Sequence, residues 1–410
     1  MTETNIWVLG GYQSDFARNL AREGGSFSSL TAEVVDGALT SAGVPAAAVE
    51  VLHVANAFGE LFAGQAQLGA RPATVRDDLW GLPASRHEAA CASGSIAALA
   101  AMADLRAGNY DCALVLGVEL EKTVGGSQGA AYMGTAAWAG NEGEDATFMW
   151  PYMFAKVADE YDHRYGLDDR HLRAISQLNL ANAKRNPLAQ TRGWDVPDLS
   201  GSSGTDDALN PPVEGRLRRY DCSQMTDGGA GVVLVNDRYL RANPGTRPVA
   251  RIAGWGHRTA GLGAEQKFAR SEGHPYVFPH LKQTVDQAFA RAGVTLEAID
   301  GLETHDCFSS SEYVAIDHIG LTPPGESWRA IENGTIAPGG SFPINPSGGL
   351  IGGGHPVGAT GVRMLVDASR QVSDTAGQMQ VEGAGRFATL NFGGSTATTV
   401  AFVLETVAVR

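Results

Sequence analysis

The chain has 410 residues, of which 43% are hydrophobic and 19% are charged, so it can bury a sizeable core in two or three domains and is not a disordered chain. Its formal net charge of −14 argues against nucleic acid and anionic membranes as the main partners, while leaving room for a local basic patch that binds a phosphorylated ligand. No apolar run approaches the roughly 20 residues that a membrane helix needs.

The four cysteines predict a protein with reduced thiols. No pair has C-x-x-C spacing, and the segment at 87–90 resembles H-E-x-x-H except that Cys91 replaces the second histidine. We therefore expect no metal site and no redox-active disulfide. Because the sequence also has no signal peptide, we expect a cytoplasmic protein. Cys112, within an apolar strand, and Cys222, where another strand approaches, are predicted to serve packing.

Strands and helices alternate along the first 120 residues. The predicted strands are 5–9, 49–57 and 112–117, and the predicted helices are 30–42 and 91–105. Gly43 and Gly108 end the two helices. The strand at 112–117 is a continuous apolar run, which is typical of a strand buried on both faces. This alternation predicts an α/β fold.

The composition changes at about residue 120. Glycine and alanine dominate 125–143, and the following segments are predicted as two helices at 154–165 and 169–185 and as loops at 200–205 and 210–212. A strand pattern resumes at 230–235. We interpret 120–216 as an insertion over one face of the first α/β unit, where long excursions commonly build a substrate-covering surface.

The second half of the chain repeats the first. The tripeptide A-G-V at 42–44 recurs at 292–294, 250 residues later, and the order of the elements is kept. The turn at Cys91 corresponds to 354–359, which contains His355, so two pseudo-symmetric halves would bring these two side chains face to face. The predicted domains are a first half at 1–119 and 217–245, the insertion at 120–216, and a second half at 246–410.

The residues around Cys91 point to acyl transfer through a thioester. Cys91 lies among small residues where an apolar helix begins, and the free amides of a helix N-terminus favour a thiolate. Segments at 305–308, 345–356 and 391–395 add an imidazole to activate the thiol, a second proton-transfer group and glycine amides for an oxyanion.

These motifs resemble the thiolase superfamily as a set. The resemblance rests on C-A-S at 91–93, on N-x-x-G-G and G-H-P-x-G-A-T-G within 345–361, on the glycine pair at 393–394, and on the segment at 221–230. It extends over nearly all of the chain, in the right order. It implies two pseudo-symmetric α/β halves in α-β-α-β-α layers, with a covering loop insertion.

The chain departs from the commonest thiolase pattern at two places. Where the commonest pattern has a loop with the sequence N-E-A-F, this chain has His305-Asp306-Cys307-Phe308. Where that pattern has the cysteine of a final C-x-G motif, this chain has Asn391. Both changes resemble the sterol-carrier-protein type of thiolase, in which the cysteine of H-D-C-F is taken to replace the missing one.

The resemblance implies an acyltransferase that cleaves 3-oxoacyl-CoA or condenses acetyl-CoA, in the degradation of fatty acids or sterol side chains. Cys91, activated by His355, accepts the acyl group, and Cys307 moves the α-proton of the acetyl-CoA unit. His305 and His355 hold the enolate oxygen. The backbone amides of Cys91 and Gly393 hold the tetrahedral intermediate.

Coenzyme A thioesters are the expected substrates, with no tightly bound cofactor and a homodimer or homotetramer implied by the resemblance. Candidates for binding the coenzyme A phosphates are Arg216, Arg218 and Arg219, which cluster where the insertion rejoins the core. Asn345 is expected to hold its turn, and Asn391 to hydrogen-bond its loop.

Two other functions compete with this one. The segment at 125–129 matches the G-x-S-x-G motif of hydrolases, but it does not follow a strand directly and we expect a loop after it, not the helix that the motif needs. The second alternative is a thiolase-like protein that binds lipid or acts as an aldolase with a partner protein, without thiolase turnover. The presence of Cys91, His305, Cys307 and His355 argues against that loss of chemistry.

Overall fold

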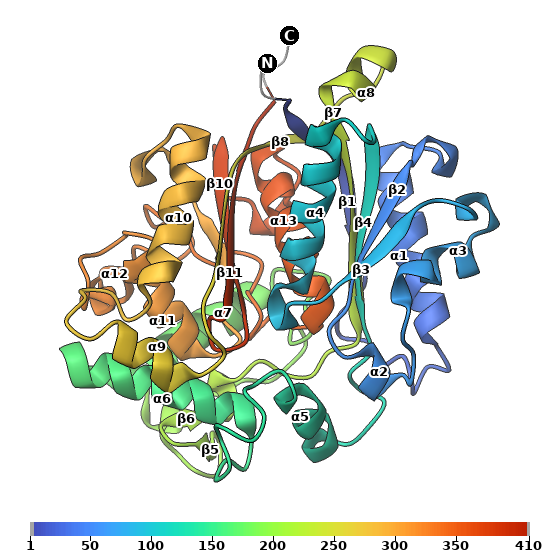
Figure 1. Cartoon of the computed structure of the whole chain (residues 1–410). Coiled ribbons are helices and arrows are strands. Elements are labelled where there is room, and N and C mark those ends of the chain that lie inside the picture. Colours follow the sequence, from blue (N-terminus) through green and yellow to red (C-terminus); the bar gives the residue numbers. More distant parts are fainter. Residues whose placement is uncertain (1–3, 408–410) are drawn as a thin grey trace.

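A computed structural model describes residues 4–407, and residues 1–3 and 408–410, at the outer ends of the predicted first and last domains, lie outside the described range. A nine-stranded mixed sheet runs through the molecule (Figure 1). In spatial order its strands are β3 (Ala84–His87), β2 (Val51–Ala55), β4 (Cys112–Glu119), β7 (Gly228–Asn236), β1 (Ile6–Gln13), β8 (Ala250–Thr259), β11 (Thr398–Glu405), β10 (Arg386–Gly393) and β9 (Leu302–Thr304).

The sheet consists of two halves that meet at one edge. β1 pairs antiparallel with β8 over only three residues, Ile6–Val8, whereas it pairs with β7 along nearly its whole length. All eight residues of β4 are buried, as the continuous apolar run predicts. A short run of backbone hydrogen bonds therefore joins the two half-sheets, and one hydrophobic cluster contains residues of both, such as Val232 of β7 and Phe402 of β11.

Helices fill the space between the half-sheets and cover their outer faces. The central helices α4 (Ser93–Ala107) and α13 (Thr360–Val372) pack against each other, and α4 contacts β2 and β4 while α13 contacts β7 and β10. On the outer faces, α1 (Phe27–Ala42) covers β1 and β7, and α10 (Pro279–Ala292) covers β8 and β11 (Figure 1). The predicted α-β-α-β-α layers are confirmed.

The 250-residue repeat is visible in the geometry of the turns. α1 and α10 both end at a left-handed glycine, Gly43 with φ of 63° and Gly293 with φ of 69°. Each glycine is followed by a short 3₁₀ turn, Ala46–Ala48 and Leu296–Ala298. Glycine adopts this conformation without the strain that a Cβ would add, so the same sequence signal gives the same turn twice.

The insertion lies across one end of the sheet (Figure 1). It contains α5 (Gly126–Gly134), α6 (Met149–Tyr165), α7 (Asp169–Ala183) and β5 (Pro212–Glu214), which pairs with β6 (Leu217–Arg218) just beyond its end. The prediction of a loop after the G-x-S-x-G segment is wrong, because α5 forms there and packs against α6. The C-terminal end of α5 is held by a hydrogen bond that the Trp150 indole donates to the Met133 carbonyl.

Shorter helices complete the fold. They are α2 (Gly59–Phe62), α3 (Arg71–Val75), α8 (Asp237–Ala242), α9 (Ala264–Arg270), α11 (Ser309–His318) and α12 (Ser327–Glu332). Among the helices of residues 4–407, none combines the length and the apolar character required to cross a membrane.

Candidate active site

Cys91 sits on a 3₁₀ turn, Ala90–Ala92, that leads directly into α4. Ala90 has a left-handed φ of 49°, which is unusual for a residue with a Cβ. Polar side chains hold this strained turn, since Glu88 accepts a hydrogen bond from the Ala90 amide and Ser93 Oγ both accepts from the Ala89 amide and donates to the Ala90 carbonyl. The turn thus fixes the direction of the cysteine side chain.

His355 lies on a glycine-rich loop that precedes α13, in the turn equivalent to that of Cys91. Its backbone N–H donates to Thr226 Oγ1 at 2.9 Å, and its Nδ1 lies 2.7 Å from Thr360 Oγ1. The buried Glu121 carboxylate accepts from the amides of Thr226 and Val357, so it ties the loop to the strand that returns from the insertion.

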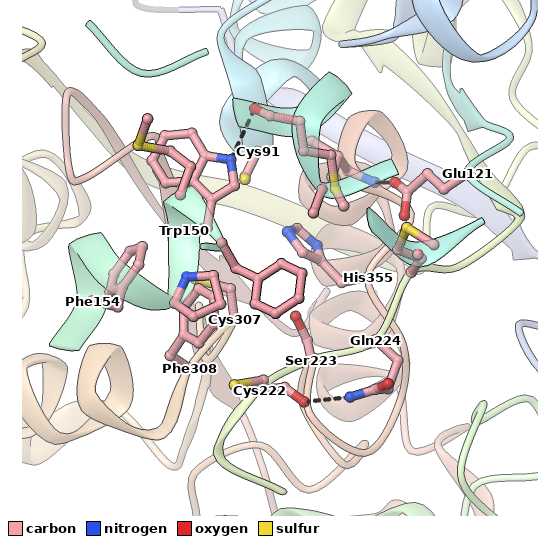
Figure 2. A pocket seen from close by; sticks show the side chains of 18 of the residues that line it. Cys91, Glu121, Trp150, Phe154, Cys222, Ser223, Gln224, Cys307, Phe308 and His355 are labelled. Atoms are coloured by element: carbon pink, nitrogen blue, oxygen red, sulfur yellow. Dashed lines mark hydrogen bonds between the residues drawn. The ribbon is translucent and has the colours of Figure 1, made fainter. Parts of the chain in front are cut away.

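The fold brings four of the predicted residues together. The Cys91 sulfur and one ring nitrogen each of His305 and His355 all lie within 4.8 Å of one another. The two imidazole rings meet edge to face, with centroids 5.2 Å apart. Cys91, Cys307 and His355 line one cavity of about 650 Å³, as Figure 2 shows, and His305 lies fully buried behind its wall.

Burial controls the protonation of all four groups. It raises the pKa of Cys91 to about 12, with Glu121 adding to the effect. It also raises the pKa of Cys307 well above its ordinary value, and the neighbouring Cys91 raises it further. Burial lowers the pKa of His355 to about 3 and that of His305 well below its ordinary value. At neutral pH the resting site therefore holds two thiols and two neutral imidazoles.

Such a set can carry out proton transfer and nucleophilic attack. A neutral imidazole is a base, and a buried thiol becomes a nucleophile when that base takes its proton. Thiolate and imidazole are also ligands that suit Zn²⁺, and Cys91, His305 and His355 are the one group among residues 4–407 whose donor atoms lie close enough together to hold a metal ion.

Comparison with known proteins identifies the family. Residues 7–191 match the family model described as thiolase, N-terminal domain, and residues 264–406 match the one described as thiolase C-terminal domain-like. The acetyl-CoA acetyltransferase of Methanothermobacter thermautotrophicus is 31% identical over 93% of this chain and 94% of its own length. The chain belongs to the thiolase family.

Other relatives and solved structures agree. Sterol carrier protein 2 of Homo sapiens is 27% identical over 93% of this chain and 69% of its own length. The solved structure titled Ltp2-ChsH2(DUF35) aldolase superposes with a TM-score of 0.74 at 20% identity, covering 98% of both chains. Acetyl-CoA acetyltransferase from Syntrophomonas wolfei superposes with a TM-score of 0.68 at 17% identity, covering 99% of this chain and 100% of that one. These structures show that the fold is that of thiolases.

Within this thiolase framework, the predicted loop residues lie at different depths. Gly394 lines the cavity, and its backbone N–H lowers the pKa of Cys91, whereas Gly393 lies one residue further from the cavity. A Cβ on Gly393 would stand 2.1 Å from the Ala89 carbonyl, so this glycine lets β10 pass beneath the cysteine turn. Asn345 accepts from the Thr304 amide and donates to Glu312, and thus holds its turn beside β9, as expected.

The three arginines proposed for coenzyme A differ in position. Arg219 lines the cavity. Arg216 is engaged by the carboxylates of the α6–α7 region, pairing with Asp162 at 2.9 Å and Asp169 at 3.1 Å. Arg218 pairs with Asp207 at 2.7 Å. Neither of these two lines the cavity, so Arg219 is the one that faces the space beside the thiols.

The walls of the cavity were not predicted from the sequence. Aromatic and methionine side chains from the insertion form most of them, including Met133, Phe148, Met149, Trp150, Phe154 and Trp194. Trp150 and Phe154 flank the thiols in Figure 2. Cys222, predicted to serve packing, also lines the cavity. The cluster of large apolar residues at 148–154, within an otherwise glycine-rich insertion, was the feature of the sequence that could have predicted these walls.

Proposed function

We propose that this protein is an acyl-CoA thiolase that cleaves a 3-oxoacyl-CoA with coenzyme A, or catalyses the reverse Claisen condensation, through an acyl group on Cys91. One observation carries the proposal. A cysteine sulfur and two histidine nitrogens lie within 4.8 Å of one another, and a second thiol, that of Cys307, faces the same cavity. A hydrolase would need no second thiol at this position.

In the first half of the cleavage reaction, His355 takes the proton from the Cys91 thiol. The thiolate attacks the 3-oxo carbon of the substrate, and the bond between C2 and C3 then breaks. The acyl group stays on sulfur, and the electron pair moves onto the thioester oxygen as an enolate, which His305 and the protonated His355 stabilise. Cys307 gives its proton to C2, and acetyl-CoA leaves.

In the second half, a new coenzyme A thiol gives its proton to the Cys307 thiolate. The coenzyme A sulfur attacks the acyl carbon, and the carbon–sulfur bond to Cys91 breaks. The released Cys91 thiolate recovers its proton from His355. All groups return to the neutral state that burial favours in the resting site.

The cavity supports an apolar acyl group larger than acetyl as the substrate. Its volume of about 650 Å³ falls in the range of small-molecule sites, and its walls are rich in aromatic and methionine side chains. Burying such a chain contributes about 0.8 kcal/mol for each CH₂ group. Arg219 lies where a coenzyme A phosphate can be paired.

A graded series of 3-oxoacyl-CoA substrates, starting with acetoacetyl-CoA, tests the proposal in the presence of coenzyme A. We expect turnover to rise with the length of the acyl chain and an acyl group to be recovered on Cys91 by mass spectrometry. Cys91→Ala should abolish thiolysis, and Cys307→Ala should still form acyl-enzyme slowly while losing condensation. Thiolytic turnover by Cys91→Ala would refute the mechanism.

A second candidate is an aldolase-type protein that works with a partner. It is favoured by the superposition on a solved structure titled as an aldolase with a DUF35 component, with a TM-score of 0.74. The series of 3-oxoacyl-CoA substrates distinguishes the two candidate functions. Absence of turnover with every 3-oxoacyl-CoA, for a protein that is folded and binds acyl-CoA, would favour the second.

A further inference from the structure

We infer that Asn391 is a positioning residue that fixes His305 as the tautomer with its proton on Nε2, opposite to the tautomer of His355. The inference deepens the proposed thiolase function, because it assigns one histidine as the hydrogen-bond donor and the other as the base. Asn391 occupies the place where the commonest thiolase pattern has a cysteine, and a cysteine cannot make the same set of contacts.

The orientation of the Asn391 amide is determined by two neighbours. Its Nδ2 lies 3.2 Å from the Cys91 carbonyl oxygen, and a carbonyl can only accept a hydrogen bond. Its Oδ1 accepts a hydrogen bond of 2.7 Å from Ser95 Oγ, at the first turn of α4. The NH₂ side of the amide must therefore face Cys91, and the oxygen must face Ser95.

This orientation decides the tautomer of His305. Nδ2 of Asn391 also lies 3.1 Å from Nδ1 of His305, and an amide NH₂ can only donate. One N–H of Nδ2 donates a hydrogen bond to the Cys91 carbonyl oxygen, and the other donates to Nδ1 of His305. Nδ1 of His305 must consequently accept, and in a neutral ring the proton then resides on Nε2.

Nε2 of His305 is the nitrogen left for the reaction. It is fully buried and has no hydrogen-bond partner among the described residues. A buried N–H without a partner destabilises the site unless a ligand accepts its hydrogen bond. An oxygen that carries developing negative charge beside the Cys91 sulfur would be such a partner, which is the condition for an oxyanion donor.

His355 has the reverse arrangement. Its Nδ1 lies 2.7 Å from Thr360 Oγ1, and that hydroxyl donates its single proton to the Pro356 carbonyl at 3.1 Å. The hydroxyl must therefore accept from Nδ1–H of His355. The lone pair of His355 then lies on Nε2, as a base for the Cys91 thiol requires. The two rings, 5.2 Å apart, thus have complementary roles.

¹⁵N NMR of the full-length, unliganded protein with labelled histidine tests the assignment directly. We expect His305 to be protonated on Nε2 alone and His355 on Nδ1 alone at pH 7, with signals assigned through His305→Ala and His355→Ala. Protonation of His305 on Nδ1, or on both nitrogens, would overturn the inference. The tautomers are observed in the wild-type protein, and the two alanine variants are used only to assign its signals.

Asn391→Asp supplies the second measurement. A carboxylate accepts, so the proton of His305 should move to Nδ1, and kcat for thiolysis should fall about 100-fold, as for loss of one oxyanion donor, with KM changed less than threefold. Ser95→Ala is the matched control, because it removes the Oδ1 contact and keeps both contacts of Nδ2, and it should keep the wild-type tautomer. An unchanged tautomer in Asn391→Asp would contradict the inference.

The tests of the two proposals are separable. If NMR shows the expected tautomers but no 3-oxoacyl-CoA is cleaved, the thiolase function fails and the role of Asn391 in setting the tautomer stands. If thiolysis occurs while His305 is protonated on Nδ1, the thiolase function stands and the role of Asn391 fails.

Discussion

Two opposing effects act on the Cys91 sulfur. The amides at the start of α4 and that of Gly394 favour a thiolate, whereas removal from water and the nearby Glu121 favour the thiol. Burial dominates, because the sulfur is removed from water and the two imidazoles beside it are neutral. A sequence-based expectation of a thiolate at a helix N-terminus therefore needs correction, and the thiolate forms only as His355 takes the proton.

This balance gives a measurable pH dependence. Because the pKa of Cys91 is raised to about 12, its thiolate fraction is small at neutral pH and rises about tenfold for each pH unit. We expect the rate of alkylation of Cys91 by iodoacetamide to rise up to pH 9.5 without a plateau. Glutathione measured in parallel should level off near an ordinary thiol pKa, and Cys91→Ser should show the background from the other cysteines. A plateau for Cys91 below pH 9 would indicate a preformed thiolate.

Glu119 is a single residue on which two active-site loops depend. Its carboxylate accepts from the Asn56 side chain and from the amides of Ala57, Phe58 and Gly358, while burial raises its pKa to about 7. Glu119→Gln would turn an NH₂ group toward buried donors. We expect a loss of about 3 kcal/mol in the free energy of unfolding, measured with urea. Glu265→Gln, on an exposed ion pair, should change it by less than about 0.5 kcal/mol.

At the level of elements, the site depends on how closely α4 and α13 approach. A Cβ on Gly94 of α4 would meet the Val362 amide nitrogen at 2.7 Å, and a Cβ on Gly361 of α13 would meet the Ser95 amide nitrogen at 2.3 Å. These glycines let the two helix starts touch backbone to backbone. The turns of Cys91 and His355 precede these starts, so the distance between base and nucleophile follows from helix packing.

Gly361→Ala should separate the two helices. We expect a loss of about 1–3 kcal/mol in stability and at least a tenfold fall in kcat/KM for thiolysis, because the base moves away from the thiol. Gly245→Ala is a suitable control, since a Cβ there meets nothing within 4 Å. Urea unfolding and steady-state kinetics of both variants provide the measurement. Wild-type kinetics in Gly361→Ala would show that the helix contact does not set the site.

At the scale of the whole molecule, the two halves are not independent. α13 belongs to the second half by sequence, yet it packs on β1 and β7 of the first half as well as on β10. Twelve of its thirteen residues are buried. The half-sheets also share the hydrogen bonds between β1 and β8. Separation would expose one face of α13 and a sheet edge to water.

Expression of residues 246–410 alone tests this dependence. We expect that segment to lack cooperative unfolding, observed by circular dichroism during heating, and to aggregate through the exposed face of α13. Co-expression with residues 1–245 should restore a folded complex that co-purifies. A cooperatively folded, monomeric second half would show that the predicted domain boundary separates autonomous units.

The local features of this protein can be predicted from its amino-acid sequence. Helix ends at Gly43 and Gly108 and the buried strand at 112–117 depend on residues close together in the chain, where capping and periodicity act. The placement of Cys91 and His355 in equivalent turns followed from the repeat. The resemblance to thiolases, now confirmed, added the expected roles of the residues.

The polar contacts and the walls of the cavity, in contrast, depend on how distant segments pack in three dimensions. Asn391 contacts the Cys91 carbonyl across 300 residues and His305 across 86, and no local pattern specifies such pairs. The same holds for Arg219, which faces the cavity while its neighbours form ion pairs elsewhere. Hydrogen-bond direction and burial are set by packing between distant segments, and they determine which nitrogen holds a proton and which cysteine stays a thiol.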